Sequence, residues 1–336
     1  MNVWKLVEPK KLVKSEAPLP EPKEGLVRVR VTKVLLNKQD AALYCGAVWL
    51  KYPLIPGRYA VGFVAEEGNA FFPKGTRVLL HAYRPVPKSG TEKRDFTAAD
   101  YYACGRTVDG FLCDFVLVSP DDLTPLPAVV GDERGLFLHH VAAAREIVER
   151  LDAEKGRHYA IVGADLIGIL VCQILIYQQA APILVDADKK RLEFAKSCGI
   201  YYTVPEDGDL VDAVASITGG RLASGAAYIA TASGNDSAAP FLLTENDGTV
   251  VYFATSMNKV TVDLETAFRK HLTLHCVSHG VKHLKTAINL MANKAVDPTP
   301  FHASTIKAAQ VEDLLANYNS VPDRDVYEIN VVNLLQ

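Results

Sequence analysis

Residues 159–186 constrain the fold of this chain more than any other stretch. They run from an apolar segment, YAIVG, through a short turn into an apolar helical stretch and then a second apolar segment, APILVD. A strand, a helix and a second strand in this order predict a βαβ unit, whose two strands lie side by side in a parallel sheet. The turn follows the dinucleotide-binding pattern G-x-G-x-x-G with Gly163 and Gly168, but Asp165 stands at the middle glycine.

The two glycines of this turn suit a phosphate-binding role. Gly163 permits the tight turn out of the strand, and Gly168 lets the following helix lie close to the sheet. Asp165 has two interpretations, because an aspartate at a helix start caps free N–H groups, yet a phosphate would occupy the same place. We expect a nucleotide site that binds weakly, with the Asp165 side chain directed toward the helix backbone.

Asp186 ends the second strand of the unit, 23 positions after Gly163. A carboxylate there can accept hydrogen bonds from the ribose diol of NAD(H), whereas it would repel the 2′-phosphate of NADP(H). The alternative is that Asp186 only caps a loop. Lys189, Lys190 and Arg191 follow closely enough to pair with a phosphate, which weakens the preference for NAD(H).

The rest of the chain divides into a strand-rich first third and a middle in which strands and helices alternate. LVRVRVTKVLL, GTRVLLHA and GFLCDFVLV follow strand patterns in the first third. AAYIATAS, NDGTVVYFA and LTLHCVS extend the parallel sheet, LKTAINLMANK predicts a late helix, and VYEINVV predicts a last strand. The stretch 83–107 is the least regular and is expected to form a surface lobe with little sheet.

Composition limits the functions that this chain can have. Its 336 residues, 49% of them hydrophobic and 22% charged, suffice for two domains with buried cores. A net charge of -3 provides no basic surface for nucleic acid, and no stretch reaches the ~20 apolar residues of a membrane span. The N-terminus lacks the apolar core of a signal peptide, and six scattered cysteines without a C-x-x-C pair are typical of reduced thiols. We expect a cytoplasmic protein that binds neither nucleic acid nor membrane.

Eight segments occur in an order and at distances that define a family resemblance. They are NKQDAALYCG, YPLIPGRYAVGFV, KGTRV, DGFLCDFVLV, YAIVGADLIG, VDADKKRLEFAKSCG, IATAS and FRKHLTL, and they cover nearly the whole chain. In these segments the chain resembles the medium-chain dehydrogenase/reductase superfamily, which contains zinc alcohol, sorbitol and threonine dehydrogenases and zinc-free quinone reductases. The resemblance implies an α/β fold, with a Rossmann doubly wound parallel sheet inserted in a GroES-like β-barrel domain. We expect the barrel at 1–124 and 283–336, the Rossmann domain at 125–282, and a hydride-transfer site in the cleft.

The positions that align with the family's zinc ligands carry other residues here. The first cysteine aligns with Asn37, the G-H-E segment contains Arg58 and Tyr59, and a glutamate before a proline aligns with His139. Zinc needs three or four nitrogen, sulfur or carboxylate ligands, whereas this pocket offers one histidine beside a fixed positive charge. The region of the family's structural zinc retains only Cys104. We expect no zinc at either site.

Hydrogen-bond donors are expected to replace the metal. Tyr59 is the first choice as proton donor and His139 as relay, with Arg58, Asn37 and Asp40 nearby. Asn37 with Asp40 is similar to the N-x-x-D stretch of zinc-free quinone reductases. The alternative is a polar cluster whose members satisfy one another and only fill the old site.

The resulting hypothesis is a zinc-independent oxidoreductase that moves a hydride between NAD(H) and a small alcohol or carbonyl compound. The resemblance adds Leu166, Ile167, Thr231 and Ala254 to the expected cofactor contacts and implies a homo-oligomer, a dimer or a tetramer. The rival hypothesis is a degenerate relative that binds a ligand or a partner protein without catalysis.

Four histidines recur at every fourth position and raise a separate question about metal. On one helix, His271, His275, His279 and His283 would form a ladder of ligands. LTLHCVS reads as a strand, however, and at ~3.3 Å per residue His275 and His279 would stand roughly 13 Å apart. We expect ordinary core and loop histidines, or residues that line a subunit or substrate surface.

Overall fold

The computed structural model of the chain describes residues 1–47, 51–66, 72–86, 101–230, 235–254, 260–318 and 329–335. The chain forms two compact units, Met1–Phe137 with Phe301–Gln336 and Leu138–Pro300. The first boundary lies 13 residues later than the predicted one, and the second lies 18 residues later. The second difference has a physical reason, because the segment after residue 282 packs against a helix of the second unit.

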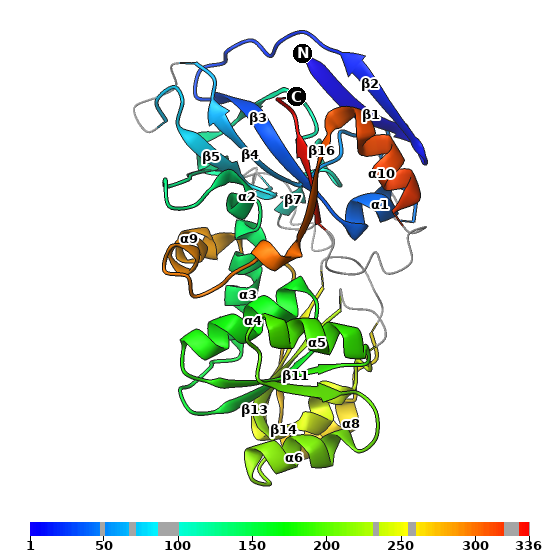
Figure 1. Ribbon diagram of the computed structural model, residues 1–336, viewed down its shortest axis with the longest axis vertical. Helices are drawn as coiled ribbons and strands as arrows, with labels where there is room; N and C mark the ends of the chain where they lie inside the picture. The colour runs from blue at the N-terminus through cyan, green and yellow to red at the C-terminus, as the bar shows by residue number, and fades with distance from the viewer. Residues whose placement is uncertain are drawn as a thin grey trace, which may run out of the picture. The chain divides into compact units, whose positions relative to one another are not determined.

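The first unit is built around a seven-stranded sheet to which both ends of the chain contribute (Figure 1). Its strands follow the order β16 (His302–Lys307), β17 (Ile329–Asn333), β3 (Val27–Leu36), β4 (Tyr59–Val64), β5 (Arg77–Leu80) and β9 (Leu123–Pro125), and β8 (Phe115–Val118) also pairs with β3. In β3, Val27, Val29 and Val31 alternate with polar residues and are buried. This alternation is typical of a strand with one face on a core.

Short elements complete the first unit. Two antiparallel pairs, β1 (Asn2–Glu8) with β2 (Lys11–Glu16) and β6 (Tyr83–Pro85) with β7 (Tyr101–Ala103), lie outside the main sheet. The helices are α1 (Lys38–Tyr44), α2 (Asp132–Gly135) and α10 (Val311–Asn317), with 3-10 turns at η1 (Pro120–Asp122) and η4 (Ala308–Gln310). The 3-10 turn η3 (Thr299–Phe301) includes the boundary between the two units. α1 and α10 pack together although they stand far apart in the sequence. The predicted lobe contains only the β6–β7 pair among its described residues, and 87–100 lie outside them.

The predicted strand GFLCDFVLV is shorter than expected, because only Phe115–Val118 form β8. The backbone of the preceding residues is held elsewhere: the Phe111 N–H donates to the Gly57 carbonyl at 2.8 Å. A Cβ at Gly110 would stand 2.3 Å from the same oxygen. Only glycine allows this close approach, so the backbone at Gly110 lies against Gly57 and the strand begins later.

The second unit contains a six-stranded parallel sheet. Its order is β12 (Tyr202–Pro205), β11 (Ala181–Asp186), β10 (His158–Val162), β13 (Ala223–Ile229), β14 (Thr244–Phe253) and β15 (Thr273–Val277). From β10 the chain adds β11 and β12 on one side of the sheet. It then returns to the middle and adds β13, β14 and β15 on the other side, which is the doubly wound order. The predicted Rossmann sheet is therefore confirmed, including LTLHCVS as a strand.

Helices cover both faces of this sheet (Figure 1). One face carries α3 (Leu138–Arg150), α4 (Leu166–Tyr177) and α5 (Lys189–Ser197), and the other carries α6 (Leu210–Thr218), α7 (Ala239–Leu243) and α8 (Leu264–Lys270). The turn η2 (Val281–His283) and α9 (Leu284–Ala292) pack on α3. β10 and β11 are apolar and buried on both sides, as expected for parallel strands between two helical layers. No helix in the described part of the chain is long and apolar enough to cross a membrane.

Candidate active site

The turn between β10 and α4 has the backbone geometry that its two glycines predict. Gly163 has φ +117°, a value that side chains of L-residues rarely permit. A Cβ at Gly168 would lie 1.9 Å from the carbonyl oxygen of Gly163. A glycine at 163 is therefore needed for the turn, and a glycine at 168 is needed for α4 to lie close to the turn. Leu166 and Ile167 form the start of α4 and are buried.

Asp165 is the N-cap of α4, as one of its two interpretations predicts. Its Oδ1 accepts a hydrogen bond from the Gly168 N–H at 3.0 Å, and the residue is buried. The helix start thus already has a carboxylate on one of its free N–H groups, where a phosphate oxygen would otherwise bind. The predicted orientation of this side chain is confirmed, whereas its effect on a nucleotide stays a prediction.

Asp186 is fully buried at the end of β11, and both of its carboxylate oxygens are engaged. Oδ2 accepts from the Ala164 N–H at 2.7 Å and from Asn235 Nδ2 at 3.2 Å. Oδ1 accepts from the Asp188 N–H at 2.8 Å. The residue therefore ties the glycine turn to the loop after β11. These contacts are those expected if Asp186 caps a loop, which is the alternative interpretation. A hydrogen bond from Asp186 to a ribose stays a prediction.

Lys189 and Arg191, which follow Asp186, are paired with carboxylates. The Lys189 ammonium stands 2.7 Å from Asp207 Oδ2. Arg191 is buried, with Nη1 at 3.6 Å from Asp186 and Nε at 3.8 Å from Asp188. Since each carboxylate holds its cation in place, Lys189 and Arg191 are less available to a 2′-phosphate than the sequence suggested.

An open hollow of about 850 Å³ lies at the carboxyl ends of β11 and β12. Ala187, Glu206 and Asn235, which follow β11, β12 and β13, contribute to its lining, together with Asp209 and Asp236. The side-chain oxygen of Asn235 accepts from the Ala187 N–H at 2.8 Å, and Glu206 accepts from the Asp236 N–H at 2.8 Å. Ligands of doubly wound sheets bind at this edge, so the hollow is a candidate for one end of a dinucleotide.

The other predicted cofactor residues lie near the same edge or outside the described residues. Ala254 follows β14, and its N–H donates to the Val277 carbonyl at 3.1 Å. Thr231 lies outside the residues that the structure describes.

In the first unit, Asn37 and Asp40 form the start of α1. Asn37 is the N-cap, and its Oδ1 accepts from the Gln39 N–H at 2.9 Å. Asp40 Oδ2 accepts in return from the Asn37 N–H at 2.9 Å, which completes a capping box. Burial raises the pKa of Asp40 to about 6, although the Asn37 N–H and the charge of Arg58 act in the opposite direction. The N-x-x-D stretch therefore has a structural role in this helix.

Arg58 is buried in the first unit and contacts several polar groups. Its Nη1 donates to Gln39 Oε1 at 3.1 Å and to the Tyr83 hydroxyl at 3.3 Å. Its Nε donates to the Cys104 carbonyl at 3.3 Å, and the guanidinium carbon lies 5.6 Å from the centre of the Tyr83 ring. Burial alone would lower the pKa of Arg58, but Tyr83, Tyr59 and Asp40 raise it, so the guanidinium stays charged.

Tyr59 stands next to this charge as a protonated phenol. Burial raises its pKa far above the usual range, and Tyr83 raises it further, while Arg58 lowers it. The side chain hydrogen-bonds with both Tyr83 and Arg58. We call Gln39, Asp40, Arg58, Tyr59 and Tyr83 the arginine cluster. It combines a buried positive charge with a neutral O–H donor.

The arginine cluster includes two members that the sequence did not indicate as site residues. Tyr83 lies in β6 within the irregular lobe, 24 positions after Tyr59, and no local pattern connects the two. Gln39 lies inside the N-x-x-D stretch, where its side chain carried no separate signal. His139, by contrast, is the second residue of α3 in the second unit and is buried. Its relay role stays a prediction.

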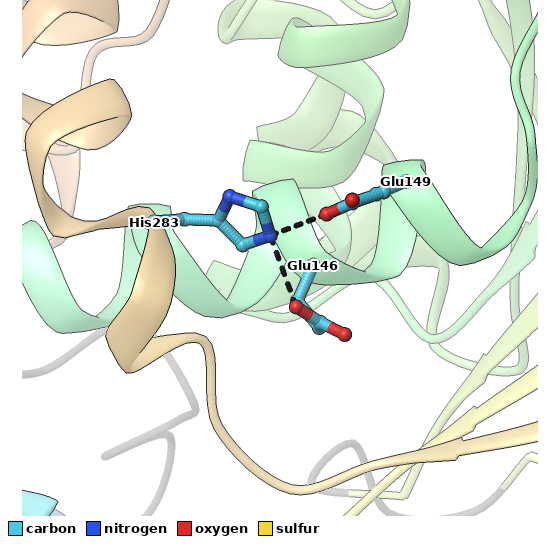
Figure 2. A group of neighbouring side chains, drawn as sticks. All are labelled: Glu146, Glu149 and His283. Atoms are coloured by element: carbon cyan, nitrogen blue, oxygen red, sulfur yellow. Dashed lines mark hydrogen bonds and ion pairs between the residues drawn. The ribbon is translucent and has the colours of Figure 1, made fainter.

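The four spaced histidines do not share a helix. His271 ends α8 with φ +55°, His275 lies within β15, and His283 ends η2. The predicted placement on a strand and in loops, rather than on one helix, is confirmed. His283 has carboxylates beside it, however, which the sequence did not indicate (Figure 2).

Family models match both units. Residues 23–128 match the alcohol dehydrogenase GroES-like domain, and residues 167–293 match the zinc-binding dehydrogenase domain. An uncharacterized zinc-type alcohol dehydrogenase-like protein of Haemophilus influenzae is 25% identical over 338 residues, covering 97% of each chain. D-xylulose reductase A of Aspergillus niger is 24% identical over 315 residues, covering 88% of this chain and 87% of its own.

Solved structures share the fold over the whole chain. A candidate zinc-binding dehydrogenase from Sinorhizobium meliloti bound to NADP has a TM-score of 0.83 at 20% identity, covering 99% of each chain. An alcohol dehydrogenase from E. coli complexed with NADH has a TM-score of 0.83 at 18% identity, also covering 99% of each chain.

A GroES-like sheet unit together with a Rossmann unit defines a dehydrogenase of the alcohol dehydrogenase type. The chain belongs to the medium-chain dehydrogenase/reductase superfamily, and the predicted fold class is confirmed. The assignment as a nicotinamide-dependent oxidoreductase of this superfamily is confirmed with it.

Proposed function

We propose that the chain transfers a hydride between NAD(H) and a small polyol or its carbonyl counterpart without a catalytic zinc. The observation that carries the proposal is the arginine cluster, in which Arg58 and Tyr59 replace a metal-binding segment. A carbonyl that accepts a hydride develops negative charge on its oxygen, and a guanidinium with a phenol can stabilise that charge. The polyol is suggested by relatives such as D-xylulose reductase A.

The residues at the aligned zinc positions do not suit zinc. Asn37 is an amide engaged in capping α1, and Arg58 is a buried cation that repels a metal ion. Tyr59 is a phenol whose proton is retained well above neutral pH. Zinc prefers thiolate, imidazole or carboxylate ligands, so we derive no step through a metal at this position.

The second unit suits a nicotinamide dinucleotide, which supplies or takes up the hydride when bound. Gly163 and Gly168 provide the turn and the close helix approach that a pyrophosphate site needs. Glu206, Asp209 and Asp236 line the hollow at this edge. Their charge would oppose a 2′-phosphate, so we propose a preference for NAD(H) over NADP(H).

In the reduction of a carbonyl compound, the chain's own residues would hold and move the proton. The Tyr59 O–H donates to the substrate oxygen, and Arg58 stabilises the charge on that oxygen and on the phenol. Tyr83 lies in contact with both side chains and positions them. For His139, which belongs to the second unit, the predicted role as a proton relay stays a proposal.

The test is turnover with and without a chelator. The protein is dialysed against EDTA, then assayed for NAD⁺ reduction with a panel of pentitols, hexitols and butanediol. We expect activity with at least one polyol, unchanged by the chelator and not increased by added Zn²⁺. Loss of activity with EDTA and its recovery with Zn²⁺ would refute zinc independence. Absence of turnover with every polyol, despite NADH binding, would refute the substrate class.

The homo-oligomeric state, which rests on the family resemblance, and the cytoplasmic location, which rests on the composition of the sequence, remain proposals. Size-exclusion chromatography with light scattering tests the first, with a dimer or a tetramer as the expected result.

A further inference from the structure

A second group of polar side chains lies within the Rossmann unit, between α3 and η2. Glu146 and Glu149 stand one turn apart on α3, and His283 faces both of them from η2 (Figure 2). We propose that these three side chains bind a divalent transition metal ion of the Zn²⁺ type. We call this group the α3–η2 site.

The backbone fixes the position of η2 on α3. A Cβ at Gly280 would stand 2.0 Å from the Ala142 carbonyl oxygen, so the two segments are in direct backbone contact. The His283 N–H then donates to the Gly280 carbonyl at 2.8 Å, which closes the turn. The imidazole is therefore held over α3 before any ligand binds, and a preformed site loses less conformational entropy on binding.

The ligand atoms lie at distances that one ion can bridge. His283 Nε2 is 2.5 Å from Glu149 Oε2 and 3.0 Å from Glu146 Oε2. One atom from each residue lies within 4.8 Å of the other two. Zinc binds imidazole nitrogen at about 2.0–2.1 Å and carboxylate oxygen at about 2.0–2.2 Å, so a small adjustment would admit an ion.

Burial gives the site one closed and one open side. The side chains of Glu146 and His283 are 8% and 12% exposed, whereas that of Glu149 is 44% exposed. The buried pair would fix the ion, and Glu149 would close over it from the solvent side. A water molecule would complete the coordination, as in zinc sites with three protein ligands.

Two cations already stand beside the carboxylates and would compete with a metal. The Lys282 ammonium lies 3.0 Å from Glu146 Oε2, and Arg150 Nε lies 2.9 Å from Glu146 Oε1. Burial alone would raise the pKa of Glu146, but the contacts with Lys282 and Arg150 together lower it. Lys282 is 52% exposed and can move into solvent when an ion binds, while Arg150 can stay on the other oxygen.

The competing interpretation is an ion-pair network that binds no metal, and Lys282 distinguishes the two. In a network, Lys282→Met only removes a cationic partner of Glu146 and of Glu149. At a metal site, the same change removes a positive charge that opposes the ion, so the affinity for Zn²⁺ should rise about tenfold.

The experiment is calorimetric titration of EDTA-treated, dialysed protein with ZnCl₂ near neutral pH. We expect one equivalent bound by the wild type, tighter binding by Lys282→Met, and a loss of at least about a hundredfold in His283→Gln. Glutamine can still donate to one carboxylate, so this variant should keep its fold, which thermal unfolding checks. His275→Gln, a histidine in β15 outside the site, is the matched control and should bind as the wild type does.

A parallel titration with Co²⁺ identifies the type of ligand. The α3–η2 site predicts a d–d spectrum without a sulfur-to-cobalt charge-transfer band. Three results would overturn the proposal: no Zn²⁺ binding by wild type or Lys282→Met, unchanged binding in His283→Gln, or a thiolate band that points to an exposed cysteine such as Cys276. None of these results depends on turnover, so they are independent of the proposed hydride transfer.

Discussion

The carboxylate of Asp186 accepts a hydrogen bond from the backbone N–H of Ala164 at 2.7 Å, across 22 residues of sequence. This bond joins the end of β11 to the glycine turn that follows β10. Asp188 and Asn235 donate to the same carboxylate, so no oxygen of Asp186 is left without a hydrogen bond. A ribose diol would therefore have to replace the Asn235 amide or share an oxygen with a backbone N–H.

The first prediction concerns the stability that Asp186 provides. The Asp186→Asn variant keeps one acceptor oxygen, whereas the N–H groups of Ala164 and Asp188 use two in the wild type. One of these two hydrogen bonds should therefore be lost. The free energy of unfolding should fall by about 1–3 kcal/mol in urea denaturation. Asp207→Asn removes only an exposed contact with Lys189 and should change stability by less than about 1 kcal/mol. Equal stability of the two variants would contradict this account.

The second prediction concerns Asp165 and the affinity for NADH. If the Asp165 carboxylate lies about 5 Å from a phosphate of NADH at an effective dielectric near 20, their repulsion costs roughly 3 kcal/mol of binding free energy. This corresponds to about a hundredfold in affinity. Both Asp165→Asn and Asp165→Gly should therefore bind NADH more tightly in a fluorescence titration. Asparagine caps a helix as well as aspartate does, and glycine costs only a few tenths of a kcal/mol more, so both variants should fold.

The two Asp165 variants also separate charge from crowding. A gain in glycine alone would indicate that the side chain, rather than its charge, obstructs the phosphate. If neither variant binds a dinucleotide at about millimolar concentration while folded, the non-catalytic rival becomes the better description.

The third prediction concerns the proton donor. Tyr59→Phe removes the O–H group and should lower kcat by a factor of about 10²–10⁴, with little change in KM. Tyr83→Phe keeps the Tyr59 O–H and should have a smaller effect, because Tyr83 acts by positioning. Full turnover in the double variant Tyr59→Phe, His139→Ala would show that the reaction takes its proton elsewhere.

The fourth prediction concerns pH and the stability of the first unit. Burial raises the pKa of Asp40 to about 6 from its ordinary 3.8, so the native state binds more protons than the unfolded state between these values. The contribution of Asp40 to the free energy of unfolding should fall by roughly 3 kcal/mol as pH rises through this window. His81 has the opposite sign, because burial lowers its pKa to about 4 from 6.5 and its contribution is lost as pH falls.

Asp40→Asn isolates the first of these two effects. Asparagine retains an acceptor for the Asn37 N–H but does not titrate. Urea denaturation at several pH values from 4 to 7 should show the variant gaining stability relative to the wild type by roughly 3 kcal/mol. Parallel pH curves for the two proteins would contradict a raised pKa at Asp40.

The backbone of the nucleotide turn was predictable from sequence because it depends on local rules. Gly163 is required by its positive φ, and Gly168 is required because its backbone lies against the Gly163 carbonyl, five positions earlier. Asp165 follows the preference for aspartate at helix N-caps. The parallel strands were predictable from apolar runs of strand length. By contrast, the shortened β8 depends on a contact between Gly110 and Gly57, which lie 53 positions apart.

The side-chain partners of the sites were the least predictable part. The side chain of Tyr83 meets Arg58 and Tyr59 from a lobe without a clear pattern. His283 meets Glu146 of α3 although the two residues lie 137 positions apart. Such contacts arise when distant elements pack, so no local spacing in the sequence encodes them. Asp186 shows the same limit, since its strand-end position was predictable but its four contacts were not.

The most direct test of the account is a titration of the EDTA-treated protein with NADH and with NADPH under identical conditions, followed by fluorescence. The account predicts saturable, weak binding of NADH and weaker binding of NADPH, because Asp186, Glu206, Asp209 and Asp236 oppose a 2′-phosphate. Tighter binding of NADPH, or no binding of either dinucleotide at about millimolar concentration by folded protein, would contradict it.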